Sequence, residues 1–198
     1  MIKLTKPNCP NPQILKTDYK YSENKEALKQ STYGKCMYCE TKITATEYGD
    51  VEHIKPKKLF PELTYNWNNL GFACEICNRT YKNDNYDDKF INPYSENPEE
   101  FLDAIGAFIV PKNGNERGLY SCDILGLNRI DLGQKRNEEI LSIKKIIDEL
   151  LRNPNSNVKS SLIHELKEFI REKSEYSFVK RKFIEDYCSK VGLENLFG

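Results

Sequence analysis

The sequence predicts an α+β protein with a metal-bound core and a helical C-terminal subdomain. Two Cys-x-x-Cys pairs bracket a polar segment that carries short strand-type patterns. Beyond Asp131, apolar residues recur every three or four positions, as they do in amphipathic helices. A chain of 198 residues is long enough for one domain with an appended subdomain. We divide it into four parts: residues 1–30, 31–92, 93–136 and 137–198.

The first part is expected to be an extended segment followed by a short helix. Pro7, Pro10 and Pro12 interrupt any periodicity, so residues 1–17 are expected to run over the surface. Ser22 is a suitable N-cap for a helix that ends near Gln30.

The second part is defined by its paired cysteines. Each Cys-x-x-Cys pair can place two sulfurs on one tetrahedral ion, and two pairs complete a shell without an open position. The pattern therefore predicts one structural zinc ion. The alternatives are a redox pair or two disulfides, but a redox site needs only one pair. The four predicted zinc ligands are Cys36, Cys39, Cys74 and Cys77.

Between the two pairs, the sequence predicts a hairpin. β-branched residues over 41–46 indicate a strand, Gly49-Asp50 a turn, and residues 51–54 the returning strand. The returning strand is expected to carry Glu52 and His53 outward. A loop over residues 61–67 follows, in which Tyr65 and Trp67 are either a core plug or a base-stacking surface.

A short helix is expected to begin near Glu75 and to turn Asn78 toward the hairpin. Zinc at both ends of the segment would hold Glu52, His53 and Asn78 together without a large core. Pro56 three residues after the imidazole makes ordinary core packing of His53 an unusual arrangement.

This order of motifs, Cys-x-x-Cys, Glu-His-Ile-x-Pro, Asn-Leu and Cys-x-x-Cys-Asn, resembles the zinc-stapled HNH endonucleases. The resemblance implies a ββα-metal core, which is a hairpin and a helix around a catalytic ion. It also implies that Asn69 fixes the loop that carries the general base.

A wider likeness runs through most of the chain to about Arg136. Residues 34–40, 51–57, 61–70 and 124–129 are similar to the HNH proteins of Septu-type and retron-associated anti-phage systems. This resemblance implies a nuclease effector that acts with an ATPase partner, and it allows for a higher-order complex.

The residue types also suit phosphodiester hydrolysis, which needs a base to activate water and a cation to neutralise developing charge. His53 can act as the base, because neutral imidazole is available near neutral pH. Glu52 and Asn78 offer oxygen ligands to Mg²⁺ or Mn²⁺. HNH enzymes more often have Asp or His before the base, so glutamate leaves the choice of metal open.

Basic residues surround the motif in the sequence and are expected to contact nucleic-acid phosphates, unless they are an ordinary solvated surface. The chain has 30 basic and 30 acidic residues, so DNA binding depends on such local patches rather than on a broad positive field. The expected phosphate contacts are Lys55, Lys57, Lys58, Arg79 and Lys82.

In residues 93–136, the segment 108–110 is expected to form a hairpin with Leu119-Tyr120. The three apolar stripes after Asp131 either pack on the core or dock a partner protein. His164 is expected on a helix surface. Lys180-Arg181-Lys182 is either a solvated face or a contact to the DNA backbone.

No apolar run approaches the roughly 20 residues of a membrane span, and the N-terminus lacks the apolar core of a signal peptide. We therefore expect a cytoplasmic protein. The isolated cysteines Cys9, Cys122 and Cys188 are expected to be buried or half-buried thiols, as suits a reducing compartment.

The sequence thus predicts a metal-dependent DNA endonuclease that works with an ATPase. One alternative is the same nuclease acting alone or on RNA. The other is a zinc-stabilised nucleic-acid or protein-binding module with an inactive HNH site. His53 favours an enzyme, because a binding module needs no imidazole between a metal-type carboxylate and a proline.

Overall fold

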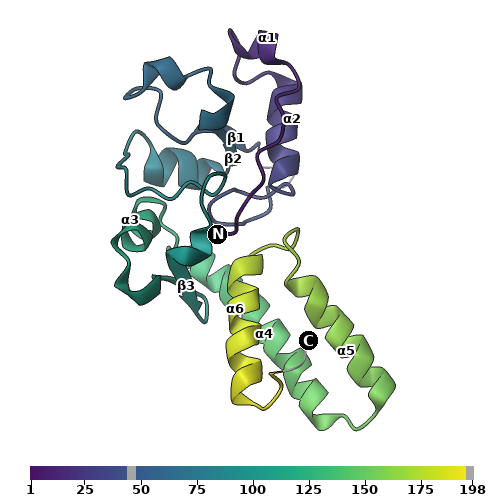
Figure 1. Ribbon diagram of the computed structural model, residues 1–198. Coiled ribbons are helices and arrows are strands. Elements are labelled where there is room, and N and C mark those ends of the chain that lie inside the picture. Colours follow the sequence, from purple (N-terminus) through teal and green to yellow (C-terminus); the bar gives the residue numbers. More distant parts are fainter. Residues whose placement is uncertain (44–47, 195–198) are drawn as a thin grey trace.

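The computed structural model describes residues 1–43 and 48–194. Figure 1 shows a core with two small hairpins, from which three C-terminal helices extend to one side, with the N-terminus near the junction. One hydrophobic cluster fills the core and a second lies between the C-terminal helices. The predicted α+β class and the helical C-terminal region are confirmed.

The central hairpin pairs β1 (Asp50–His53) with β2 (Leu70–Ala73) in antiparallel register. The prediction that residues 41–46 form the strand that pairs with β1 is wrong. Of the described residues in that segment only Lys42 pairs, in a single bridge with Lys35, and residues 44–46 lie outside the described residues. β2 pairs with β1 instead. All four residues of β2 are buried, so its backbone groups need strand hydrogen bonds away from water.

Gly71 on β2 explains how closely the first cysteine pair packs against the hairpin. A Cβ atom at this position would overlap Met37 Sδ, so a larger residue would force the Met37 side chain to move. The same turn is tied to β2 by the Met37 amide, which donates to Phe72 O over 2.9 Å. The metal-binding turn and the strand therefore form one packed unit.

The short helix expected from Glu75 is present as the π-helix η3 (Ile76–Lys82). The Asn78 amide donates to Cys74 O over 3.0 Å, so the helix grows directly from the second cysteine pair. Asn83, with φ 48°, ends it. The π geometry widens the turn that carries Asn78, and such turns are frequent at functional sites.

The N-terminal part contains α1 (Pro12–Leu15) and α2 (Ser22–Ser31). The expectation that residues 1–17 run over the surface is wrong, because Met1, Ile2 and Leu4 are buried in the core. The α2 N-cap is Tyr21 rather than Ser22, and no side chain caps it.

The loop between β1 and β2 contains the turns η1 (Pro61–Leu63) and η2 (Trp67–Asn69). Trp67 packs against the core and donates from Nε1 to Pro7 O over 2.7 Å. This agrees with the interpretation that it fills the core rather than stacking on bases. Tyr65 is 46% exposed, so it is not part of that plug.

The second hairpin pairs β3 (Leu102–Ile105) with β4 (Phe108–Pro111). The predicted pairing with Leu119-Tyr120 is wrong, because those residues lie in α3 (Glu116–Ile124). Asn115 Oδ1 accepts from the amides of the first helical turn and starts α3 there. The remaining short helical turns are η4 (Pro98–Glu100) and η5 (Lys112–Gly114).

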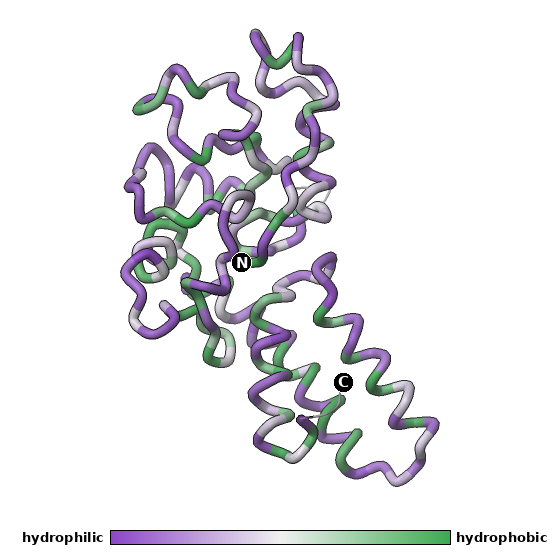
Figure 2. The backbone as a smooth tube through the Cα atoms, viewed as in Figure 1, coloured by the Kyte–Doolittle hydropathy of each residue, from purple (hydrophilic) through white to green (hydrophobic). Residues whose placement is uncertain are grey.

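The C-terminal subdomain contains the three predicted helices, α4 (Ile130–Arg152), α5 (Ser156–Phe169) and α6 (Ser177–Lys190). Figure 2 shows hydrophobic residues recurring along all three. Most residues of the stripes pack inside the protein, whereas Leu151 is 44% exposed; the buried ones are Ile140, Ile143, Ile147, Leu150, Leu166, Phe178 and Ile184. None of the described helices is both long and apolar enough to cross a membrane.

His164 and the basic run 180–182 are also predicted to lie on the surface of this subdomain, and they differ in outcome. His164 is exposed on α5, as expected. Lys180-Arg181-Lys182 is not a solvated face, because Lys180 is buried against Glu139 and Arg181 forms a two-pronged ion pair with Glu99. The isolated cysteines match the prediction, with Cys9 half-buried and Cys122 and Cys188 buried.

Candidate functional site

A hollow of about 540 Å³ opens beside β1 and the start of η3. It brings Glu52 and His53, which are adjacent on β1, together with Asn78, which is distant in sequence, and with residues that sequence reasoning did not single out. The added residues are Tyr19, Lys20, Asp50, Asn83 and Asp84.

His53 is the last residue of β1, and it lines this hollow although only 8% of its surface is exposed. Its Nε2 lies 3.0 Å from Thr64 O, so in the neutral imidazole Nε2 carries the proton and donates to that carbonyl. Nδ1 is then unprotonated and able to accept a proton. The edge of the Tyr19 ring packs against the imidazole with centroids 4.6 Å apart, which restricts its plane.

The environment also keeps the imidazole neutral. Burial lowers the pKa of His53, the Thr64 carbonyl opposes that shift, and the positive charges of Lys57, Lys82 and Lys20 lower the pKa further. Both ring orientation and pKa therefore suit a group that takes up a proton at neutral pH.

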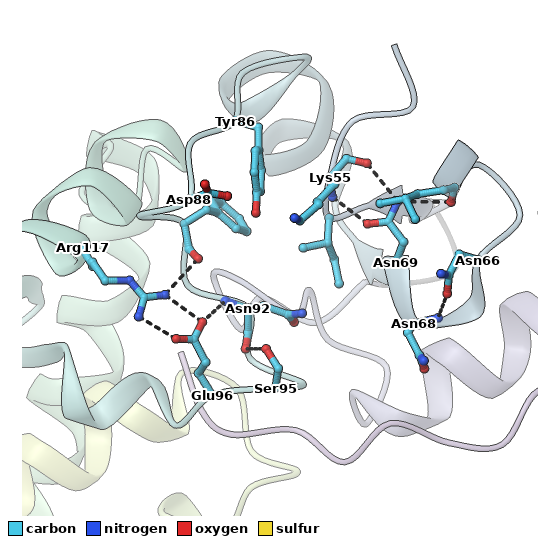
Figure 3. A pocket seen from close by; sticks show the side chains of 13 residues that line it. Lys55, Asn66, Asn68, Asn69, Tyr86, Asp88, Asn92, Ser95, Glu96 and Arg117 are labelled. Carbon is cyan, nitrogen blue, oxygen red and sulfur yellow. Dashed lines mark hydrogen bonds and ion pairs between the residues drawn. The ribbon is translucent and has the colours of Figure 1, made fainter. Parts of the chain in front are cut away.

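Asn69 holds the chain that follows His53 (Figure 3). Its Oδ1 accepts from Lys55 N over 2.8 Å, and its Nδ2 donates to Lys55 O over 2.9 Å and to Leu63 O over 3.3 Å. The Ile54 amide donates to Asn69 O over 2.9 Å. One buried amide side chain thus fixes the main chain immediately after the imidazole.

Glu52 forms a buried ion pair beneath the hollow. Its Oε1 lies 2.7 Å from Lys82 Nζ and accepts from the Tyr38 hydroxyl over 3.1 Å. Burial raises the pKa of the Glu52 carboxyl, while Lys82 and Tyr38 oppose the shift. No described residue hydrogen-bonds to Oε2, and Glu52 contributes to the lining of the hollow.

The prediction that Lys82 contacts nucleic acid is wrong. Its side chain is fully buried, where Nζ pairs with Glu52 and donates to His53 O over 2.9 Å. The sequence could not distinguish it from its exposed basic neighbours, because only the π-helix turns position 82 inward.

Asp50 is an acidic residue of the hollow that sequence reasoning treated only as part of a turn. Its Oδ2 accepts from Asn78 Nδ2 over 2.9 Å, and Arg79 donates to both of its carboxylate oxygens at 2.8 and 2.7 Å. Its position three residues before His53 on the same strand could have suggested its place here. Asp50, Glu52 and Asn78 together provide oxygen atoms of the kind that Mg²⁺ and Mn²⁺ bind.

Four of the five predicted phosphate contacts lie on or near the surface. Lys57 is exposed beside the hollow and donates to the Tyr19 hydroxyl over 2.9 Å. Lys58 is exposed and pairs with Asp84 at 3.2 Å. Arg79 is engaged with Asp50, and Lys55 is half-buried near two aromatic rings.

The four cysteines form one buried cluster whose sulfur atoms all lie within 4.8 Å of one another. The Cys39 and Cys74 sulfurs are 3.8 Å apart. Zn–S bonds of about 2.3 Å in a tetrahedron give an S···S edge of about 3.8 Å, so the residues fit zinc. Donors also face the sulfurs: the Cys77 amide lies 3.5 Å from Cys74 Sγ and Arg129 Nη1 lies 3.6 Å from Cys77 Sγ.

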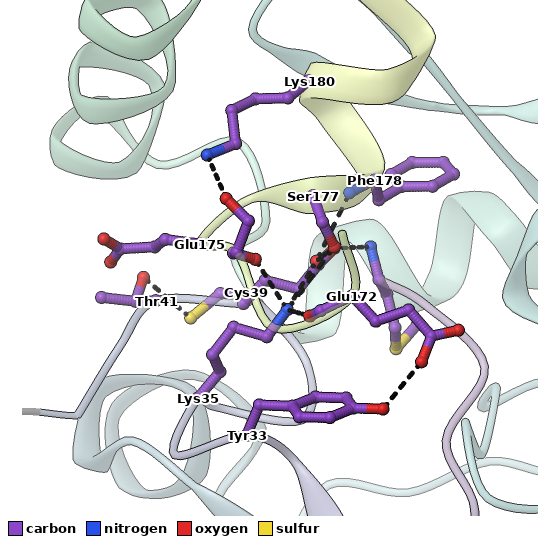
Figure 4. Close-up of polar contacts among 12 residues, drawn as sticks. Tyr33, Lys35, Cys39, Thr41, Glu172, Glu175, Ser177, Phe178 and Lys180 are labelled. Atoms are coloured by element: carbon purple, nitrogen blue, oxygen red, sulfur yellow. Dashed lines mark hydrogen bonds and ion pairs between the residues drawn. The ribbon is translucent and has the colours of Figure 1, made fainter. Parts of the chain in front are cut away.

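A polar network connects this cluster to the C-terminal subdomain (Figure 4). Thr41 Oγ1 lies 3.3 Å from Cys39 Sγ and 3.3 Å from the Tyr176 hydroxyl. Lys35, one residue before the first cysteine, donates to Ser174 O over 2.9 Å. Glu40, one residue after the second, accepts from the Ser177 hydroxyl over 2.7 Å. The metal-binding turn therefore anchors the start of α6.

Comparison with known proteins agrees with this geometry. The family model for HNH endonuclease matches residues 36–84, a segment that contains both cysteine pairs, His53 and Asn78. This segment therefore matches an HNH-type domain, and the resemblance of the motifs to HNH endonucleases is confirmed.

Beyond that segment, the chain is similar to proteins called Septu protein PtuB. One from Bacillus thuringiensis is 28% identical over 205 residues, which cover 89% of this chain and 79% of that protein. One from Bacillus mycoides (strain KBAB4) is 30% identical over 150 residues, which cover 60% of this chain and 51% of that protein. The second alignment thus spans about half of that relative. The predicted resemblance to Septu proteins is confirmed.

Proposed function

We propose that this chain is a metal-dependent endonuclease that hydrolyses phosphodiester bonds of DNA. The observation that carries the proposal is the orientation of His53. Its Nε2 is engaged with Thr64 O, which leaves Nδ1 as the basic nitrogen, and His53 lines a hollow together with Asp50, Glu52 and Asn78. A general base beside oxygen ligands for a hard cation is the minimum that this hydrolysis requires.

In this mechanism His53 accepts a proton from the attacking water at Nδ1, and the Thr64 carbonyl stabilises the imidazolium through Nε2. Asn69 keeps the following loop in place, so it acts as a positioning residue. Glu52 and Asn78, with Asp50 beside them, would hold Mg²⁺ or Mn²⁺. The bound cation would neutralise charge on the phosphate and on the leaving oxygen.

Surface charge supports a modest nucleic-acid interface beside the hollow. Lys20 and Lys57 are exposed beside the hollow and can meet phosphates directly, whereas Lys58 and Arg79 would first have to leave Asp84 and Asp50. Equal numbers of acidic and basic residues argue against strong unaided binding. A partner that supplies affinity or target choice is therefore part of the proposal.

We further propose that the chain is the nuclease effector of an anti-phage defence system and acts with an ATPase in the cytoplasm. The similarity to Septu proteins supports this assignment. The alternatives are the same nuclease acting alone or on RNA, and a zinc-stabilised binding module without activity.

A plasmid-cleavage assay tests these proposals together. Wild-type protein is incubated with Mg²⁺ or Mn²⁺, with and without the product of a neighbouring ATPase gene, and His53→Ala serves as the matched control. Cleavage by wild type that is lost in His53→Ala supports the nuclease. Equal cleavage by both proteins overturns the base assignment. No cleavage of DNA or RNA under any condition favours the binding module.

A further inference from the structure

A second hollow, of about 300 Å³, is lined by Ile54 and Lys55, the two residues that directly follow His53. It shares no lining residue with the hollow that contains His53. The Cα atoms of His53 and Lys55 are at most about 7 Å apart, because they are two residues apart along the chain. The two hollows are therefore lined by consecutive residues of the chain.

Polar groups without protein partners gather around this second hollow (Figure 3). Within residues 1–43 and 48–194, no hydrogen bond is found for the Asn68 side chain, Asn92 Nδ2, the Tyr86 hydroxyl or Lys55 Nζ. Asn92 Oδ1 accepts from Tyr94 N over 3.0 Å, which fixes the amide orientation and leaves Nδ2 as a donor. The hollow thus presents several hydrogen-bonding groups, of which the Asn92 amide is held in a fixed orientation.

Aromatic rings form part of the same surface. Tyr86 lines the hollow as a half-buried ring, and the buried Phe90 packs against it with the ring centroids 6.1 Å apart, so the stacking face is that of Tyr86. Lys55 Nζ lies 5.3 Å from the centre of the Tyr86 ring, which holds the ammonium group over an aromatic face. A flat ligand with a π-face could stack on such a surface.

The charges of the lining favour a neutral ligand over a phosphate. Lys55 and Arg117 are balanced by Asp88 and Glu96, and Arg117 is paired with Glu96 at 2.7 Å. The remaining charges, Lys55 and Asp88, are of opposite sign, so the lining offers a phosphate no net positive charge. Amide side chains, in contrast, suit the edges of nucleobases, on which Asn donates and accepts hydrogen bonds.

We propose that this hollow binds one unstacked nucleobase of the strand whose phosphate lies at His53. The inference rests on the proposed nuclease function and adds a substrate class to it: single-stranded or locally opened nucleic acid. A base inside a stacked duplex could not enter, because its face and edge are already occupied by its neighbours.

Fluorescence anisotropy on the full chain tests this binding, with His53→Ala protein to prevent cleavage. The probes are a single-stranded 12-nucleotide DNA of mixed sequence, the same strand with one abasic site moved along it, its blunt duplex, and the matching RNA strand. Comparison of the DNA and RNA strands shows which sugar the site accepts. We expect one abasic position to weaken binding by at least about 5-fold, since base stacking on aromatic side chains contributes about 1 kcal/mol or more per base.

The matched variants are Asn68→Ala combined with Asn92→Asp, compared with Asn157→Ala on the exposed surface of α5. Asn92→Asp keeps the oxygen that accepts from Tyr94 N, so the local turn is preserved. The double variant should bind the intact strand as weakly as wild type binds the abasic one, and Asn157→Ala should bind as wild type does.

Three results would overturn the inference: equal affinity for every abasic strand, tighter binding of the duplex than of either single strand, or unchanged binding by the double variant. These outcomes differ from failure of the nuclease proposal. A protein that cleaves in a His53-dependent way but ignores the abasic position is a nuclease without this base pocket.

Discussion

Lys82 Nζ donates to the main-chain oxygen of His53 over 2.9 Å and pairs with Glu52 Oε1 at 2.7 Å. This buried ammonium group connects the end of η3, the helix that carries Asn78, to β1, the strand that carries the imidazole. The relative position of the two motif residues therefore depends on a lysine that the sequence alone marks as a surface residue.

Lys82→Met is expected to lower the free energy of unfolding by about 3–5 kcal/mol, because it leaves the Glu52 carboxylate buried without its partner. Chemical denaturation measures this change. Lys58→Met is the matched control, since the Lys58 side chain is 74% exposed, and it should leave stability within about 0.5 kcal/mol of wild type. The double variant Glu52→Gln/Lys82→Met should recover part of the loss. If Lys82→Met were as stable as wild type but bound DNA with a weaker salt dependence, Lys82 would be a phosphate contact after all.

The pH dependence of cleavage should report the lowered pKa of His53. The neutral imidazole is the base, so activity is lost as pH falls through the folded-state pKa. Because burial and neighbouring lysines lower that pKa, the acidic limb should lie below the ordinary histidine value of about 6.5. Lys57→Gln removes one of these positive charges and should move the limb to higher pH. The readout is the midpoint of the limb in a pH–rate profile, and a shift to lower pH would contradict the proposed role of Lys57.

Zinc should be present at about one ion per chain, measured by metal analysis of reduced, folded protein. Cys36→Ser or Cys74→Ser should remove the ion and unfold residues 36–82, seen as loss of protection from proteolysis in that segment. Cys9→Ser is the control, because Cys9 lies outside the cluster and should keep both zinc and fold. Folded wild-type protein without zinc would refute the structural metal site.

Glu40→Gln should weaken the connection between the metal-binding turn and α6. Burial raises the pKa of Glu40, but the charges of the Met1 amino group and Lys35 outweigh it and bring the pKa to about 2. Stability from this carboxylate is therefore fully present above its unfolded value of 4.5 and is lost as pH falls toward 2. At pH 7 the variant should lose about 3–5 kcal/mol of unfolding free energy, as expected for a broken buried ion pair.

The same experiment repeated at lower pH checks the cause. The difference between wild type and Glu40→Gln should shrink as pH falls from about 4.5 toward 2, because the Glu40 carboxylate of the unfolded chain then takes up a proton while that of the folded chain stays ionised. Glu138→Gln, an exposed position on α4, should show no difference at either pH. A constant difference across this range would mean that the charge of Glu40 is not what holds α6.

The sequence alone determined the chemistry-bearing residues that lie close to one another along the chain. Paired cysteines, Glu52-His53 and the asparagine after the last cysteine are local patterns, and the fit of residue type to zinc or to proton transfer does not depend on the fold around them. The three C-terminal helices were also predictable, because their apolar periodicity is strong and continuous.

The tertiary structure decided everything that depends on partners distant in sequence. The strand that pairs with β1 was missed because an apolar run of four residues has no periodicity to mark it as a strand. Lys82 turned inward, and Asp50 and Tyr19 joined His53, only because η3 and the N-terminal segment pack against the hairpin. A charged side chain looks the same in the sequence whether it faces water or a buried carboxylate, and the packing of the whole chain determines which.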